Sequence, residues 1–186
     1  MKIKHARLYV SRREKPGLTP YETGVRTISH ALKEDDPQAR AMAALAMAGK
    51  IRSCRCLLVP VPGSSGHTIR NHALCAAIQR RKPETVVLDL LQGVPRESQC
   101  QRDRDNRHRF TAGQIRVTAK PVAVPRGYGQ AVLYLVDNVC CTGATLEACR
   151  RATAKVLNNE IRGLVYARTK QGKTNEPETI PHRGGH

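Results

Sequence analysis

One stretch constrains the fold of this chain more than any other: residues 132–152, which read VLYLVDNVCCTGATLEACRRA. Residues 132–136 are apolar and branched, which predicts a strand buried on both faces, and we expect Asp137 and Asn138 to end it. After Thr145, apolar residues recur at helical spacing. A strand that turns sharply into a helix points several backbone N–H groups at one place, where the helix dipole adds positive charge. The stretch therefore predicts a phosphate-binding loop beside a polar pair.

Strands and helices alternate through most of the chain. The alternation predicts an α/β fold with a mainly parallel, Rossmann-like sheet that is flanked by helices on both faces. Ligands of such sheets bind at the carboxyl ends of the strands. The expected strands are 57–61, 85–91, 114–120, 132–136 and 163–167, and the expected helices are 67–81 and the one after Thr145.

The N-terminal residues follow another pattern. A short strand is expected at 6–10, a capping box at 19–22 predicts the start of a helix, and a second helix is expected between Asp36 and Gly49. We therefore expect three parts. These are an N-terminal strand with a helical hairpin (1–50), an α/β core (51–170) and a mobile polar tail (171–186).

The chain is strongly basic, with 32 Lys and Arg against 15 Asp and Glu and a net charge of +17. This charge favours polyanions as partners, either nucleic acid or a phosphate-rich small substrate, and a merely solubilising surface stays open as the alternative. The basic residues are spread along the chain and are not interleaved with aromatic side chains. A stacking platform for single-stranded nucleic acid is therefore not supported.

The seven cysteines include no Cys-x-x-Cys pair, which argues against a structural zinc site. Their number is odd, and the N-terminus has no apolar stretch long enough for a secretion signal. We expect reduced thiols and a cytoplasmic location. The most apolar stretch, AMAALAMAG, is about half as long as a membrane span, so no membrane partner is expected.

The segment LYLVDNVCCTGATL resembles the PRPP-binding motif of type I phosphoribosyltransferases. In that motif a strand is followed by two acidic residues and then by Thr-Thr-Gly-x-Thr, and PRPP is 5-phosphoribosyl 1-pyrophosphate. Asp137 matches the first acid and residues 142–145 match the loop. Asn138 stands in place of the second acid, and Cys141 in place of the first threonine.

Weaker similarity over residues 54–168 points to the ComF-like branch of this family. The segments LLVPVPGSSGHTIRNHALCAAI, RESQCQRDRDNRHRF and GLVYART resemble segments of that branch. The cysteine-rich N-terminal zinc finger of many ComF proteins is absent, and residues 1–50 have no counterpart in the family. The resemblance implies a type I phosphoribosyltransferase-like core.

The resemblance also implies a reaction: transfer of phosphoribosyl from PRPP to a nitrogenous base or similar acceptor, with release of pyrophosphate. Asp137 and Asn138 are the implied catalytic residues beside the ribose hydroxyls, although Asn138 lacks the charge of an acid. Mg²⁺ would be held mainly by PRPP, so no direct metal ligand is expected. The implied 5-phosphate site is Cys141, Thr142, Gly143, Ala144 and Thr145, and the implied pyrophosphate site is Ser64, Ser65, Gly66 and Arg70.

An arginine-rich segment between residues 95 and 112 has three interpretations. It can close as a lid over the pyrophosphate, contact nucleic-acid phosphates, or be a solvated loop. Cys141 stands where relatives that salvage 6-oxopurines carry an Asp, so hypoxanthine or guanine salvage is disfavoured and the acceptor stays unknown. The candidate lid residues are Arg102, Arg104, Arg107 and Arg109.

The N-terminal part is expected to pack as a hood over the carboxyl edge of the sheet and to help bind the acceptor. Tyr21 or Tyr9 could offer a ring for a flat base, although each ring could equally fill the core of the hood. A second hypothesis is a catalytically weak regulator that senses PRPP and binds nucleic acid through its basic surface. Nucleic acid and a second copy of the chain, as a homodimer, stay open as partners.

Overall fold

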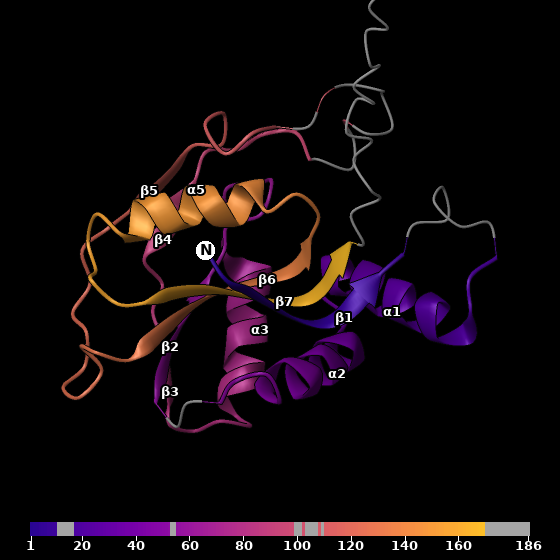
Figure 1. Cartoon of the computed structure of the whole chain (residues 1–186), viewed down its shortest axis with the longest axis horizontal. Helices are drawn as coiled ribbons and strands as arrows, with labels where there is room; N and C mark the ends of the chain where they lie inside the picture. Colours follow the sequence, from indigo (N-terminus) through magenta and orange to yellow (C-terminus); the bar gives the residue numbers. More distant parts are fainter. Residues whose placement is uncertain (11–16, 53–54, 99–101, 103–107, 109, 170–186) are drawn as a thin grey trace, which may run out of the picture.

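Five parallel strands form the central sheet of the protein (Figure 1). The computed structural model describes residues 1–10, 17–52, 55–98, 102, 108 and 110–169. The expected α/β fold with a mainly parallel sheet is therefore confirmed. In spatial order the strands are β1 (Ile3–Tyr9), β7 (Ile161–Thr169), β6 (Val132–Cys140), β2 (Cys56–Pro60) and β3 (Thr85–Val87).

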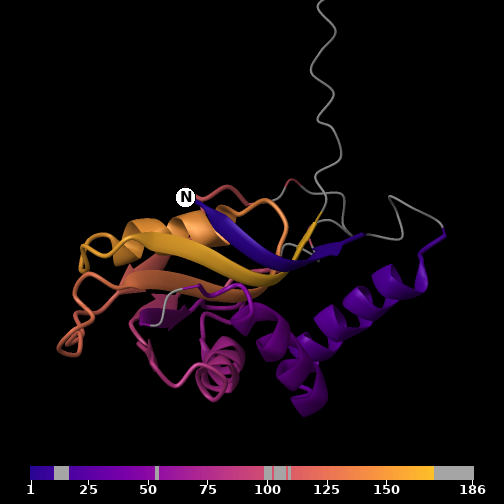
Figure 2. The ribbon, with the colours of Figure 1, turned by 60° about the horizontal axis from the view of Figure 1, so that its bottom comes forward.

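The two faces of the sheet are covered by different elements (Figures 1 and 2). Figure 2 shows the helices α1, α2 and α3 on one side of the sheet and α5 on the other. A small antiparallel sheet accompanies α5. The bounds are α1 (Pro20–Ala31), the short helix η1 (Leu32–Glu34), α2 (Pro37–Ala48), α3 (Ile69–Gln79), α5 (Ala144–Thr153), β4 (Leu91–Gly93) and β5 (Val117–Ala119).

Strand β2 explains why the central strands are continuous apolar runs in the sequence. All five of its residues are buried, because successive side chains point to opposite faces of the sheet and both faces are covered. Leu58 packs into the cluster beneath α1, α2 and α3, whereas Leu57 and Val59 pack into the cluster beneath α5. Burial of these side chains holds the strand in the middle of the sheet.

The starts of α1 and α2 are encoded locally. The Thr19 side chain accepts a hydrogen bond from the Glu22 backbone N–H (3.2 Å), and the Glu22 carboxylate accepts one from the Thr19 backbone N–H (2.8 Å). The Asp36 side chain caps α2 by accepting a hydrogen bond from the N–H of Ala39 (2.7 Å). Both predicted helix starts, and the end of α2 at Gly49, are confirmed.

Removing the α1 cap should lower stability without touching any cavity. We expect Thr19→Ala to reduce the free energy of unfolding by about 1 kcal/mol, because the helix loses its N-terminal acceptor. Thr27→Ala is the matched control, since Thr27 is exposed in the interior of the same helix. Urea unfolding of both variants tests this, and an equal loss in the two would contradict the role of the cap.

Three strand predictions are corrected. Strand β6 does not end before Asp137 but continues to Cys140, because β7 still pairs with it there (Asp137 with Val165). The predicted strand 85–91 is divided, since the chain turns over the sheet at Leu88–Leu90 and enters β4. The predicted strand 114–120 shortens to β5, which pairs antiparallel with β4 and does not join the main sheet.

The N-terminal strand is also placed differently from the expectation. β1 was expected in a hood above the sheet, but it pairs in parallel with β7 and forms one edge of the main sheet. Its alternating side chains complete the two cores: Ala6 packs on the side of α1 and α2, and Ile3 packs on the side of α5. Residues 3–9 are thus part of the sheet, and the hood hypothesis is left with α1, η1 and α2. The expected tail, 171–186, lies outside the described residues.

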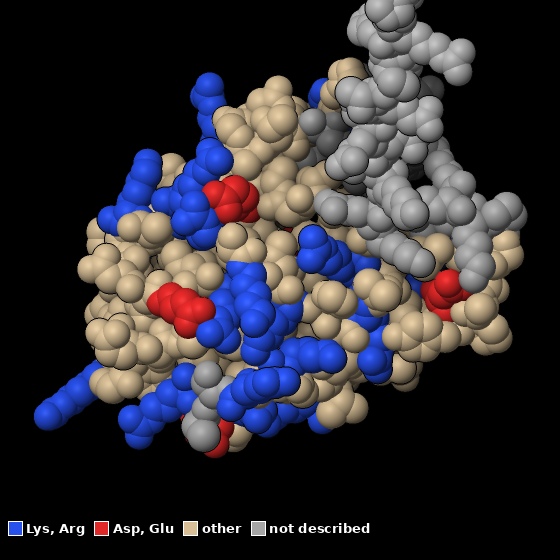
Figure 3. Space-filling model, in the orientation of Figure 1, with Lys and Arg blue, Asp and Glu red and all other residues tan. Residues whose placement is uncertain are grey.

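The basic composition is visible on the surface, where Lys and Arg outnumber Asp and Glu on the face drawn in Figure 3. In the described part of the chain, no helix is long and apolar enough to cross a membrane. The described cysteines are free thiols: Cys56, Cys75, Cys140, Cys141 and Cys149. The other two, Cys54 and Cys100, lie outside the described residues.

Candidate functional site

The order of the strands defines a crevice between β2 and β6. From β2 the chain passes through α3, on one face, to β3; from β6 it passes through α5, on the other face, to β7. The two connections leave in opposite directions, so the carboxyl ends of β2 and β6 are not covered by either helix. In open α/β sheets, this switch point is where ligands bind. A cavity of about 930 Å³ lies at this place.

The cavity brings together segments that are far apart in the sequence. It is lined by the end of β6, the loop before α5, the loop after β2 and the first turn of α3. Most of the predicted site residues are among its walls. They are Ser64, Ser65, Arg70, Asp137, Asn138, Cys141, Thr142, Gly143, Ala144 and Thr145.

The loop before α5 has the geometry of an anion site. Gly143 is the N-cap of the helix and has a φ of 83°, a left-handed conformation that favours glycine. The hydroxyl of Thr142 accepts a hydrogen bond from the Ala144 N–H (3.3 Å), and Thr145 lies in the first turn of the helix. The first N–H groups of α5 and its dipole therefore face the cavity at this loop. Such an arrangement can bind a phosphate group.

Asp137 is held in place by two hydrogen bonds to its carboxylate. Its Oδ1 accepts one from the backbone N–H of Asn138 (2.8 Å) and one from Nδ2 of Asn71 (3.2 Å). Asn71 is buried, and its side chain also donates to the carbonyl of Val61 (2.7 Å), so it links the end of β2 to the end of β6. Sequence reasoning missed Asn71, because its spacing from Asp137 in the chain gives no hint of the contact.

Burial makes the ionised form of Asp137 less favourable than it is in water. Burial raises the pKa of the Asp137 carboxyl above its usual value, while the hydrogen bonds from Asn138 and Asn71 and the positive charges of Arg96 and Lys33 act in the opposite direction. The net effect is that the pKa of Asp137 is raised. The protein therefore keeps a partly desolvated carboxylate at the floor of the cavity.

This setting predicts a pH-dependent stability difference. Asp137→Asn should raise the melting temperature at neutral pH, because the variant no longer buries a charge at this position. The gain should fall as the pH drops through the raised pKa of Asp137, and it should vanish below the ordinary pKa of an aspartate, where the parent is also neutral. Thermal melts across this range measure the difference. A gain that stays constant with pH would mean that the substitution acts through packing.

The side chain of Asn138 offers the cavity a hydrogen-bond donor, because its acceptor oxygen is already engaged. Its side-chain oxygen accepts a hydrogen bond from the N–H of Val139 (2.7 Å), which leaves the amide nitrogen as its polar group toward the cavity. A carboxylate at this position could only accept hydrogen bonds. The amide can donate to a ligand hydroxyl, but it adds no negative charge.

The loop after β2 is locked by glycine. The N–H of Gly66 donates to Gly63 O (3.1 Å), and the N–H of Gly93 in β4 donates to Gly66 O (3.0 Å). Gly66 has a φ of 84°, and a Cβ there would lie 2.5 Å from the carbonyl oxygen of Gly93. Gly66 is not among the cavity walls, so its role is to shape the loop. The neighbouring Ser64 and Ser65 line the cavity, as does the exposed Arg70.

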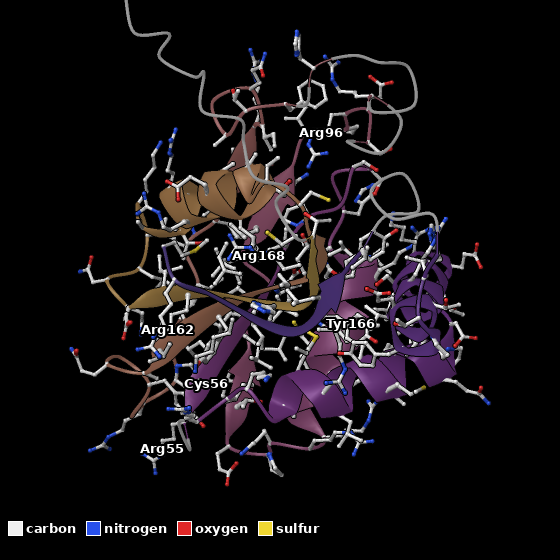
Figure 4. The ribbon with its side chains drawn as sticks, turned by 45° about the vertical axis from the view of Figure 1, so that its right-hand side comes forward. Arg55, Cys56, Arg96, Arg162, Tyr166 and Arg168 are labelled. Atoms are coloured by element: carbon white, nitrogen blue, oxygen red, sulfur yellow. The ribbon has the colours of Figure 1, made fainter. Side chains whose placement is uncertain are left out.

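Arg96 joins the two loops and was not predicted. Its backbone N–H donates to Ser64 O (2.8 Å), and its guanidinium donates to the hydroxyl of Thr145 (3.2 Å). Burial lowers the pKa of the half-buried Arg96, whereas the nearby carboxylate of Asp137 acts in the opposite direction. The side chain, labelled in Figure 4, thus places a positive charge beside the loop before α5, at the wall of the cavity.

Of the four candidate lid residues, Arg102 lies within the described part of the chain. Arg102 pairs with Glu97 (3.4 Å), donates to the carbonyl of His108 (2.6 Å) and stacks on the ring of Phe110 (4.2 Å to its centroid). Arg102 is not among the cavity walls. The other candidates, Arg104, Arg107 and Arg109, lie outside the described residues, so the lid stays a prediction.

The N-terminal segment reaches the cavity through the end of α1 and the residues after it. His30, Lys33 and Asp35 line the cavity from that side. The two tyrosines that were considered for an acceptor do not: Tyr21 is 57% exposed beneath Arg7, and Tyr9 packs against the core of the α1 face. A tyrosine ring at the acceptor position therefore stays a prediction, and the packing of Tyr9 agrees with the core-filling alternative.

Within the described part of the chain, no group of three or more His, Cys, Asp or Glu side chains is arranged to hold a metal ion. Comparison of the chain with family models, with curated proteins and with solved structures found no match.

Proposed function

We propose that this protein is a type I phosphoribosyltransferase-like enzyme of the ComF-like branch. It binds PRPP with Mg²⁺ and transfers the phosphoribosyl group to a nitrogenous base or similar acceptor. The observation that carries the proposal is the cavity at the switch point, where the loop 141–145, the Asp137–Asn138 pair and the loop with Ser64 and Ser65 share one space. The resemblance of residues 133–146 to the PRPP-binding motif implies one ligand for the first two of these segments, and the weaker resemblance to the ComF-like branch adds the loop with Ser64 and Ser65.

PRPP would lie across the two loops. Its 5-phosphate fits the N–H groups at the start of α5, and its pyrophosphate fits the loop at Ser64 and Ser65, with Arg70 nearby. The ribose then lies over Asp137 and Asn138 at the floor. Bound Mg²⁺ would partly neutralise the pyrophosphate and make it a better leaving group.

The reaction needs a negative charge near the sugar. The bond between C1 of the ribose and the pyrophosphate oxygen breaks, and pyrophosphate leaves with the electron pair. A nitrogen of the acceptor forms the new bond to C1 and releases its proton to solvent. Positive charge develops on the ribose between these events, and the fixed carboxylate of Asp137 can stabilise it. Asn71 would keep that carboxylate oriented.

Release of pyrophosphate tests the proposal. The protein, PRPP and Mg²⁺ are incubated with a panel of nitrogenous bases, and we expect release that depends on one class of acceptor. Asp137→Asn should reduce the rate by about a hundredfold or more, because it removes the charge that stabilises the transition state. Asp89→Asn is the matched control, since Asp89 is exposed and bonded to Thr68 outside the cavity walls. Equal rates in the two variants would contradict the role of Asp137.

Asn138 favours a second candidate function, a regulator that binds PRPP without efficient transfer. The amide cannot supply the second negative charge of the family motif, and its oxygen is engaged by the backbone. In that case PRPP should bind while no acceptor elicits pyrophosphate release. Asn138→Asp should then raise the release above that of the parent. A parent that already turns over, with no gain in Asn138→Asp, would exclude this second candidate.

A further inference from the structure

The amino ends of the five parallel strands gather at the edge of the sheet opposite the cavity, and this edge is basic. Each strand carries a Lys or Arg at its start or in the segment that leads into it. We call these residues the amino-edge row. In spatial order from β1 to β3, the row is Lys2, Arg162, Arg126, Arg55 and Lys82.

Contacts confirm that residues of this edge lie close together. The guanidinium of Arg55 would lie 3.2 Å from a Cβ on Gly127, so Arg55 adjoins the turn that carries Arg126. The ammonium group of Lys4 donates to the carbonyl of Lys50 (3.0 Å) and lies over the ring of Tyr134. Figure 4 shows Arg55 and Arg162 on the side of the sheet away from Arg96.

Helix ends add further positive charge to the same edge. α2 and α3 run back from the carboxyl edge to the amino edge, and basic residues follow their last turns. Cations at helix C-termini are favourable in themselves, because they oppose the dipole. Acidic residues near this edge include Glu84, Glu160, which is paired with Arg162 (2.7 Å), and Glu147, which shares a groove with Met1 and is paired with Arg150 and Arg151. The basic residues at the two helix ends are Lys50, Arg52, Arg80 and Arg81.

We infer that the amino-edge row is a binding surface for double-helical nucleic acid, contacted through its phosphates. Neighbouring strands lie about 4.8 Å apart, so the row across five strands is about 19 Å long. At about 3.4 Å per nucleotide along one strand, this length matches about five or six successive phosphates. Figure 3 shows blue side chains gathered across the centre and lower left of the face, with few red ones.

The side chains at this edge favour a duplex over other polyanions. Single-stranded binding surfaces stack bases on exposed aromatic rings. Here Tyr134 is buried, and Tyr128 donates its hydroxyl to the carbonyl of Glu84 (2.7 Å). Two of the large apolar side chains exposed in the described chain are near this edge: Met1 precedes Lys2 and lines a groove with Glu147 beside α5, and Leu45 lies in the last turn of α2. The row itself consists of Lys and Arg, so it offers mainly charge and few of the apolar anchors that membrane binding uses.

This inference does not rest on the proposed function, because the row and the cavity lie at opposite edges of the sheet. Nucleic-acid binding should be present with and without PRPP. Loss of one activity by substitution should leave the other in place, so failure of either proposal is distinguishable from failure of the other.

Fluorescence anisotropy with a labelled duplex of about 20 base pairs tests the inference, and the salt concentration is varied between about 50 and 200 mM. Four phosphate contacts, from the row without Arg162 because it is paired with Glu160, predict a slope of log K against log salt of about −3.6. The double variant Arg55→Glu/Arg126→Glu should make the slope shallower by about 2 and weaken binding at low salt at least about tenfold. Both side chains are exposed and outside the cavity walls.

The matched control is Arg116→Glu/Lys120→Glu, which makes the same change in net charge at exposed positions flanking β5. This control should retain most of the affinity, and circular dichroism should show that both variants are folded. The inference is overturned if the duplex does not bind at low salt or if both double variants lose affinity equally. Tighter binding to a single strand of equal length, or to phosphatidylserine vesicles, also overturns it.

Discussion

Replacing Gly143 by valine should abolish PRPP binding, because this residue sets the conformation of the phosphate loop. Its φ of 83° belongs to the left-handed region, which a β-branched residue avoids. A Cβ at Gly143 meets no atom closer than 3.6 Å, so the expected effect comes from the backbone and not from a clash. The loop should relax and turn its N–H groups away from the phosphate. We expect affinity to fall at least about a hundredfold, roughly the loss of two charge-assisted hydrogen bonds.

Gly127 provides a matched control with the same backbone strain. Its φ is 87°, and it lies in a turn outside the cavity walls, where an added Cβ meets only the flexible end of Arg55. Both valine variants should lose at least about 1–2 kcal/mol of stability, since each forces a side chain into the left-handed conformation. Only Gly143→Val should lose PRPP. If Gly127→Val lost it equally, general destabilisation would explain both results.

Arg96→Gln should have the second-largest effect on PRPP binding. The backbone N–H of Arg96 holds the loop at Ser64, and its guanidinium donates to Thr145 in the other loop, so the side chain can also donate to a phosphate held between the two loops. Charge-assisted hydrogen bonds to phosphate contribute about 1.5–3 kcal/mol, which corresponds to a loss of about 10- to 150-fold in affinity. Titrations with PRPP measure the loss, and titrations with ribose 5-phosphate should show a loss of the same order.

Arg102→Gln is the control for this prediction, because Arg102 is the described member of the candidate lid. Its charge is satisfied by Glu97 and its plane by Phe110, outside the cavity walls. The substitution should cost little PRPP affinity. If Arg102→Gln weakened PRPP binding more than Arg96→Gln, the result would support the lid hypothesis. It would also contradict the bridging role of Arg96.

The features that sequence reasoning predicted well are those that neighbouring residues determine. The capping box of α1, the Asp36 cap of α2 and the prolines at both helix starts act within one helical turn, so their positions could be stated from the sequence. The conformation of the loop at Gly143 is equally local, since a left-handed φ at the N-cap of α5 favours glycine, whereas phosphate binding by this loop stays a prediction. The alternation of strands and helices was sufficient to predict a mainly parallel sheet.

The features that were missed depend on partners distant in the sequence. β6 continues past Asp137 because β7 pairs with it there. The residues of β6 alone do not indicate that pairing. Asn71 reaches Asp137, and Arg96 reaches Thr145, only after the sheet has brought their segments together. β1 likewise becomes an edge strand through its pairing with β7. Spacing in the sequence carries no information on contacts of this kind.

The most direct test of the central claim is an isothermal titration of PRPP into the full chain with and without Mg²⁺. The account predicts saturable binding of one PRPP per chain that requires Mg²⁺ for full affinity. Ribose 5-phosphate and inorganic pyrophosphate should each compete with it, because each occupies one of the two loops. Absence of saturable binding at millimolar PRPP, or binding that neither compound displaces, would contradict the account.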